Sequence, residues 1–192
     1  MGVVTRYAAF LRAINVGGRQ ATKDRLVAAF EECGFENVST FRASGNVLFE
    51  APGKAKPKQA DMESALESEL GFEVPVFVRS AAQLSKIAAL QPFSAKQLKA
   101  SKGKLQVAFL PRQPAKAKAA EARALELESD PIALEGTELL WLPAEGTQTS
   151  NLNLKALERA VGPWTMRTMG TVEQIAAKLD RRERDTASRG TR

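Results

Sequence analysis

A glycine pair flanked by arginines is the first stretch of this chain whose residue types could do chemistry. The segment FLRAINVGGR follows an apolar run and contains Arg12, Asn15, Gly17, Gly18 and Arg19. Free backbone amides in a glycine turn, the positive end of a following helix and nearby arginines together can hold an anion such as phosphate. The segment is not a P-loop, because no Gly-Lys-Ser/Thr follows the glycines, and its glycine spacing is not that of a GxGxxG fingerprint. The alternative is a strand-to-helix turn that needs glycine only for its backbone freedom.

A second polar motif, Ser44-Gly45-Asn46, separates the predicted strands VSTFR and NVLFE. By itself this motif is typical of a β-hairpin turn, with glycine at positive φ and asparagine bonded to the backbone. We expect this hairpin and the strand–helix loop to lie at opposite ends of the sheet. That separation argues against one compact site formed by both, unless the second half of the chain folds over.

The composition excludes most familiar catalytic centres. Histidine is absent, so the chain can form no Ser-His-Asp triad, no Cys-His dyad and no His-ligated zinc site. Cys33 is the single cysteine, and we interpret it as a small buried apolar residue. An enzyme would have to use carboxylates, Lys, Tyr, Ser/Thr or a hard cation. The alternative function is therefore a histidine-free enzyme that acts on phosphorylated substrates with carboxylate-held Mg²⁺, although no DxD or ExxE cluster adjoins the glycine loop.

The charge balance weakly favours anionic partners. Lys and Arg number 28 against 22 Asp and Glu, for a net charge of +6. Much of the excess lies in the basic runs 54–58 and 96–104 and in the C-terminal tail, which are typical of solvated loops. No apolar run reaches the roughly 18 residues of a membrane span, and the N-terminus lacks the apolar core of a signal peptide. We therefore expect a cytoplasmic protein without a membrane partner.

The pattern of apolar residues predicts the order βαββαβ twice. The first pass covers residues 4–79, with helices after Thr22 and before Gly71, and the second begins at the strand KLQVAFLP. This order predicts an α+β protein built as a tandem duplication of a ferredoxin-like unit, with antiparallel sheets and helices packed on them. The predicted segments are a first half 1–79, a linking helix and basic loop 80–102, a second half 103–169, a C-terminal helix 170–182 and a disordered tail 183–192.

Apolar residues on both faces of the predicted strands suggest that the two halves pack on each other. A binding cleft would then lie between the halves, where Arg12 and Arg167 could both reach it. Specific RNA reading is disfavoured, because Val47 and Phe49 share a strand face that we assign to the core, whereas RNA-recognition modules expose such aromatics. We also expect Trp141 and Trp164 to be buried.

The motifs LRAINVGG, ASGNVLF and TMRTMGTVEQIAAKL resemble a bacterial family known as domain of unknown function 1697. The resemblance marks nine positions of this chain: Arg12, Asn15, Gly17, Gly18, Ser44, Gly45, Asn46, Arg167 and Thr171. Two residues depart from the family pattern, since Ala13 stands in place of a glycine and Thr168 in place of an asparagine. The family name implies no activity.

We combine these observations into one functional hypothesis. The chain is a binding protein for a phosphate-bearing small molecule or a nucleic-acid backbone, held by the glycine-arginine loop. The candidate binding residues are Arg12, Asn15, Gly17, Gly18, Arg19, Ser44, Asn46 and Arg167. We predict no metal and no cofactor, and we assign no catalytic residue.

Overall fold

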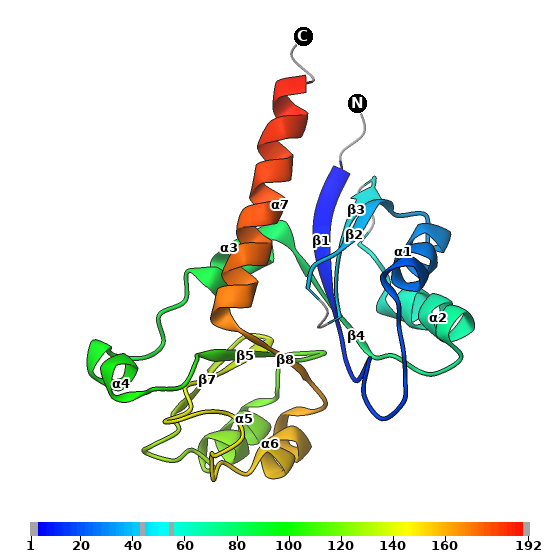
Figure 1. Ribbon diagram of the computed structural model, residues 1–192. Helices are drawn as coiled ribbons and strands as arrows, with labels where there is room; N and C mark the ends of the chain where they lie inside the picture. Colours follow the sequence, from blue (N-terminus) through cyan, green and yellow to red (C-terminus); the bar gives the residue numbers. More distant parts are fainter. Residues whose placement is uncertain (1–3, 43–44, 54–55, 190–192) are drawn as a thin grey trace. The chain divides into compact units, whose positions relative to one another are not determined.

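The computed structural model describes residues 4–42, 45–53 and 56–189, with side chains as far as Arg181. The chain divides into two compact units, each of which is treated by itself (Figure 1). The first unit comprises the residues up to Lys86 together with those from Gln174 onward, and the second is Ile87–Glu173.

The first unit has the predicted order of elements. It contains β1 (Val4–Leu11), α1 (Lys23–Glu32), β2 (Glu36–Thr40), β3 (Asn46–Pro52), α2 (Gln59–Leu70), β4 (Val76–Ser80) and α3 (Ala81–Ala88). The strands form an antiparallel sheet in the order β2-β3-β1-β4. Thr22 caps α1 by accepting a hydrogen bond from the Arg25 N–H at 3.4 Å. A capping box at α3 joins the Ser80 N–H to Gln83 Oε1 and the Gln83 N–H to Ser80 Oγ.

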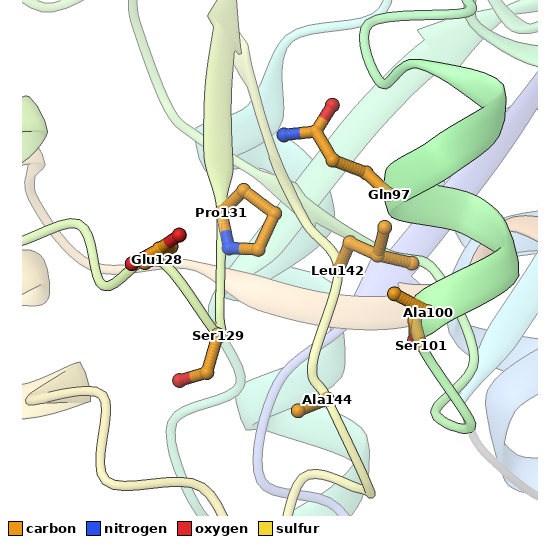
Figure 2. A pocket seen from close by; sticks show the side chains of 8 residues that line it. All are labelled: Gln97, Ala100, Ser101, Glu128, Ser129, Pro131, Leu142 and Ala144. Atoms are coloured by element: carbon orange, nitrogen blue, oxygen red, sulfur yellow. The ribbon is translucent and has the colours of Figure 1, made fainter.

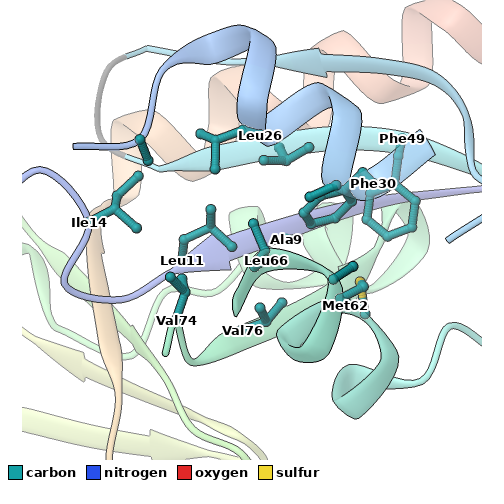
Figure 3. Packing of buried hydrophobic residues seen from close by; sticks show 14 of the residues in the cluster. Ala9, Leu11, Ile14, Leu26, Phe30, Phe49, Met62, Leu66, Val74 and Val76 are labelled. Carbon is teal, nitrogen blue, oxygen red and sulfur yellow. The ribbon is translucent and has the colours of Figure 1, made fainter. Parts of the chain in front are cut away.

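The main core of this unit lies between the sheet and helices α1 and α2 (Figure 3). Phe30 of α1 and Phe49 of β3 are fully buried, with ring centroids 5.2 Å apart. Met62 and Leu66 of α2 are likewise fully buried. Complete burial of such a side chain contributes about 1.5–3 kcal/mol, so these residues stabilise the sheet–helix contact that holds the strand ends in place. Phe49 is part of the core, as expected.

The other face of this sheet is also buried. It carries Ala8, Phe10, Leu48 and Phe77, each no more than 2% exposed. The part of α7 (Met169–Arg189) from Gln174 onward belongs to the first unit and lies on the side of the sheet away from α1 and α2 (Figure 1). On this helix, the Gln174 side chain accepts a hydrogen bond from Arg42, and the Asp180 side chain accepts one from Ser85.

Helix α7 is longer than the sequence predicted. We expected it to end near residue 182 and to be followed by a disordered tail, but the helix continues to Arg189. Neither glycine nor proline interrupts the segment RRERDTASR, and Arg, Glu and Ala favour helix.

The second unit repeats the same plan. It contains α4 (Ala95–Ala100), β5 (Gln106–Phe109), α5 (Lys116–Arg123), β6 (Ile132–Glu135), β7 (Glu138–Trp141), α6 (Leu154–Val161) and β8 (Thr165–Thr168). Its antiparallel sheet has the order β6-β7-β5-β8, which matches the first sheet strand for strand. The predicted duplication of a ferredoxin-like unit is confirmed. Trp141 and Trp164 belong to the core of this unit, as expected.

Two buried polar clusters stabilise the sheets. In the first unit, Arg6 and Glu50 are opposite each other on β1 and β3, and their side chains are 2.9 Å apart. Asn37 donates a second hydrogen bond to Glu50. In the second unit, Asp130 accepts hydrogen bonds from Trp141 Nε1 and from the hydroxyls of Ser129 and Ser150. Buried charges of this kind are tolerated only where such partners surround them.

Candidate functional site

The loop between β1 and α1 has an unusual concentration of left-handed backbone. Ala13, Asn15, Gly17 and Gly18 all have positive φ, from 56° to 82°. Asn15 closes the loop, because its Oδ1 accepts a hydrogen bond from the Ala21 N–H at 2.9 Å. A Cβ added at Gly17 or Gly18 would meet nothing within 4 Å, so these glycines are needed for their φ rather than for space.

The same geometry explains the first departure from the family pattern. Ala13 has a φ of 56°, a conformation that costs a residue with a Cβ about 1–2 kcal/mol. Glycine adopts this conformation without that cost. Ala13, which stands where the motif that the sequence resembles has glycine, keeps this conformation at an energetic cost.

The predicted separation of the loop and the β2–β3 hairpin is wrong, because the two lie at the same end of the sheet. Strands β1 and β3 are antiparallel, so the last part of β1 is paired with the beginning of β3, with Phe10 opposite Asn46. The Leu11 N–H donates a hydrogen bond to the Gly45 carbonyl at 2.8 Å. A Cβ added at Gly45 would lie only 2.7 Å from Ile14 Cδ1, so this glycine allows the hairpin to contact the loop.

A pocket of about 180 Å³, which we call the basic pocket, lies where the loop, α1 and the hairpin meet. Its polar lining consists of Asn15, Lys23, Thr40, Arg42 and Asn46. Ile14, Ala21, Leu26 and Gly45 complete the lining, which includes no Asp or Glu among the described residues. The pocket therefore combines two cationic side chains with neutral donors at the positive end of a helix.

Sequence reasoning missed the two cations of this pocket. Lys23 is the first residue of α1 and is exposed. Arg42 follows β2 with a φ of 58°, and its Nη2 donates a hydrogen bond to Gln174 Oε1 at 2.7 Å. Both cations could have been found from the antiparallel pairing of β1 and β3, because this pairing brings the N-terminus of α1 and the hairpin to one end of the sheet.

The predicted site residues of the first unit have different roles. Asn15 and Asn46 line the basic pocket, although Asn46 is fully buried and also donates a hydrogen bond to the Phe41 carbonyl. Arg19 lies over the ring of Phe72, 5.2 Å from its centroid. The Arg12 N–H donates to the Pro75 carbonyl at 3.0 Å. Gly17 and Gly18 shape the loop without lining the pocket, and Ser44 lies outside the described residues.

Arg167 belongs to the second unit, on β8. Its Nη1 donates hydrogen bonds to Thr165 Oγ1 at 2.9 Å and to the Met166 carbonyl at 2.7 Å. Burial lowers the pKa of Arg167 to about 10. Thr168, where the family has asparagine, accepts a hydrogen bond from the Thr171 N–H at the start of α7. Threonine and asparagine both cap helices, so the second departure preserves a capping role.

A second pocket, of about 270 Å³, lies in the second unit between α4 and the loops that flank β6 and β7 (Figure 2). Its lining is largely apolar, with Pro131 and Leu142 facing Ala100. Two of its polar groups serve the local structure, since Gln97 Oε1 accepts a hydrogen bond from the Ser94 N–H and Ser101 Oγ donates to the Pro143 carbonyl. None of the predicted site residues that the structure describes lines this pocket.

The carboxylates and the single cysteine are the remaining side chains that could take part in metal binding or catalysis. Glu63, Glu67 and Glu73 line a groove beside α2, where Glu63 Oε1 accepts a hydrogen bond from the Val76 N–H at 2.9 Å. Within residues 4–42, 45–53 and 56–189, no group of three or more Cys, Asp or Glu could hold a metal ion. The pKa of Cys33 is raised by burial and by the nearby Asp61 and Glu32, so the thiol is not activated as a thiolate.

Comparisons with known proteins agree with this architecture. A solved structure, that of the conserved bacterial protein SP0830 from Streptococcus pneumoniae, is similar with a TM-score of 0.70. It is 21% identical in sequence, and the match covers 93% of this chain and 99% of that chain. At this identity the likeness shows the fold alone. No curated protein matches the chain. No helix among the described residues is long and apolar enough to cross a membrane.

The N-terminal motifs carry the family assignment. Residues 4–140 match the family described as a protein of unknown function, DUF1697. This match includes the strand–helix loop and the hairpin that together form the basic pocket. Because it spans more than half of the sequence, the chain belongs to the DUF1697 family.

Proposed function

We propose that this protein binds a phosphate-bearing small molecule in the basic pocket. The observation that carries the proposal is the convergence of Lys23 and Arg42 on one pocket at the N-terminus of α1. The first N–H groups of a helix lack partners within the helix and favour an anion. Arginine and lysine supply charge-assisted hydrogen bonds to phosphate oxygens, which are about twice as strong as neutral ones.

The size of the pocket favours a small ligand over a nucleic-acid strand. A volume of about 180 Å³ is below the roughly 300–1,000 Å³ of typical small-molecule sites. This space suits a phosphate group with few further atoms. The buried position of Phe49 also removes the aromatic surface on which RNA-recognition sheets stack bases.

Thermal unfolding in the presence of ligands tests this proposal. The panel contains inorganic phosphate, sugar phosphates, nucleotides and a single-stranded oligonucleotide. A ligand present at 100 times its Kd stabilises the folded state by about 2.7 kcal/mol, which raises Tm by about 5–10 °C for a chain of this size. We expect the double variant Lys23→Gln/Arg42→Gln to lose this shift.

A matched control removes the same charge elsewhere. Lys155 and Arg159 are exposed on α6 of the second unit, so Lys155→Gln/Arg159→Gln changes the net charge equally and leaves the basic pocket intact. We expect this control to keep the ligand-induced shift. Equal shifts in both double variants, or a shift with the oligonucleotide alone, would contradict binding in the basic pocket.

A further inference from the structure

The cations of the basic pocket also bear on which kind of phosphate it takes. Lys23 and Arg42 contribute two positive charges, and the remaining polar lining, Asn15, Thr40 and Asn46, is neutral. A phosphomonoester carries a charge of about −1.5 to −2 at pH 7, whereas a phosphodiester has a single negative charge. Two cations without a neighbouring carboxylate in the lining match the charge of the monoester.

We propose that the basic pocket selects the dianion of a compact phosphomonoester over phosphodiesters. This inference rests on the proposed function and adds the ionisation state and size of the ligand to it. A diester has a second substituent on phosphorus, which must also be accommodated in a pocket of about 180 Å³. Charge and volume therefore favour the same ligand.

The absence of histidine makes this selection measurable by pH. The second pKa of a phosphomonoester is about 6, so the dianion becomes dominant between pH 5 and pH 7. Histidine is the side chain whose ordinary pKa lies in that range, and the chain has none. The raised pKa of Cys33 moves its thiol away from the range.

The charged groups around the pocket support the same reading. Lys23 and Arg42 line the pocket, and Lys178 of α7 lies near it, with its Nζ 5.4 Å from the ring centroid of Phe41. Of the charged neighbours of these residues in sequence, Arg25 is paired with Glu69, and Asp24 lies in the first turn of α1. None of them is a histidine, the residue type whose ordinary pKa lies between pH 5 and pH 7. A change in affinity between pH 5 and pH 7 therefore reports the ionisation of the ligand.

The test compares methyl phosphate with dimethyl phosphate in NMR titrations of the full-length ¹⁵N-labelled protein. The amide signals of Ala21, Lys23 and Gly45 report the basic pocket. Each exposed charge pair contributes modestly, so the second negative charge is expected to make methyl phosphate bind about 5- to 30-fold tighter than dimethyl phosphate at pH 7.5. We expect this preference to decrease at pH 5, where the two ligands have the same charge and differ only in size.

Inorganic sulfate and charge variants serve as controls. Sulfate remains a dianion from pH 5 to pH 8, so its binding should be independent of pH. The variant Lys23→Gln/Arg42→Gln should lose the preference for methyl phosphate, and Lys155→Gln/Arg159→Gln should keep it. An unchanged two-dimensional NMR spectrum away from the pocket establishes that each variant is folded. The pH dependence measured on the wild type tests the proposal even if a variant does not fold.

The outcomes separate the two proposals. Equal affinities for the two phosphates, or a preference that is the same at pH 5 and pH 7.5, would overturn monoester selection and leave phosphate binding in place. If no phosphate compound shifts the three amide signals, both the inference and the proposed function are wrong.

Discussion

Replacing Asp130 by alanine tests whether a buried carboxylate holds the second unit together. Asp130 is 3% exposed, and its Oδ1 accepts hydrogen bonds from Trp141 Nε1 at 3.3 Å and from Ser150 Oγ at 2.6 Å. Ser129 donates to Oδ2 at 2.7 Å. These contacts link the start of β6 to β7 and to the segment that precedes α6.

The expected cost follows from the partners that the substitution leaves behind. Trp141 is fully buried, so its indole N–H would lose its acceptor without access to water. A buried unsatisfied donor costs about 1–3 kcal/mol, and the lost charge-assisted hydrogen bond from Ser150 adds about 1 kcal/mol or more. We expect Asp130→Ala to destabilise the protein by about 3 kcal/mol, or about 6–12 °C in Tm. Asp130→Asn, which retains an acceptor for Trp141, should cost about half as much.

The pH dependence gives the prediction a second, independent readout. Burial alone would raise the pKa of Asp130, but the hydrogen bonds from Ser150, Ser129, Trp141 and the Ala144 backbone outweigh it and lower the pKa overall. A folded-state pKa below the unfolded value of about 3.9 means that the carboxylate stabilises the fold above that pH. This stabilisation is lost as the pH falls through the folded-state pKa. The stability difference between wild type and Asp130→Asn should therefore shrink below about pH 4.

Tryptophan fluorescence during urea or thermal unfolding is the appropriate assay, because both tryptophans, Trp141 and Trp164, lie in the second unit. Ser129→Ala is the matched control, since Ser129 is exposed and donates to the other carboxylate oxygen. A loss of less than about 1 kcal/mol in Asp130→Ala, or a loss equal to that of Ser129→Ala, would refute the reasoning.

Four further substitutions in the first unit have predictable effects, each measured as a change in Tm by circular dichroism. Ala13→Gly should raise stability by about 1 kcal/mol, because it relieves a φ of 56°; an unchanged or lower Tm would contradict this. Gly45→Ala should cost about 2–4 kcal/mol of stability, because the residue has a φ of 72° and the added Cβ would clash with Ile14. Gly17→Ala should cost about 1–2 kcal/mol, because its φ is also positive but the added Cβ would meet no neighbouring atom. Equal losses in these two glycine variants would contradict the close contact. Glu50→Ala should cost about 3–5 kcal/mol, because it leaves Arg6 without its buried carboxylate; a surface-like loss below about 1 kcal/mol would contradict this.

The repeated fold was predictable because hydrophobic periodicity is a local property. In α2, the spacing of Met62, Ala65, Leu66 and Leu70 predicts one buried face, and all four are buried. Helix lengths were less predictable. The alanine-rich segment after Pro114 continues in sequence to Glu128, but α5 ends at Arg123, where Leu125 and Leu127 turn to pack against the core. Tertiary packing overrides helix propensity at such places.

The candidate site was only partly predictable, because a site depends on which chain ends meet. The residue types around Asn15 and Asn46 identified two of the elements that form the basic pocket. Their meeting depends on the direction of β3 relative to β1, which the predicted antiparallel βαββαβ unit already sets, so the contact was predictable although we expected the opposite. The arginine that lines the pocket, Arg42, also has a positive φ that nothing in its sequence neighbourhood indicates.

A comparison of the two units supports placing the proposed phosphate site in the first unit. Both units join the strand end to the hairpin in the same way, since the Leu11 N–H donates to the Gly45 carbonyl and the Leu110 N–H donates to the Thr137 carbonyl. In the second unit, however, the hairpin carries Glu135 and Glu138, and Glu138 stands opposite Phe109 as Asn46 stands opposite Phe10. Carboxylates at that end repel an anion, whereas Lys23 and Arg42 attract one. The shared backbone contact therefore supports the fold in both units, and the proposed anion site depends on the side chains that the first unit carries at this end.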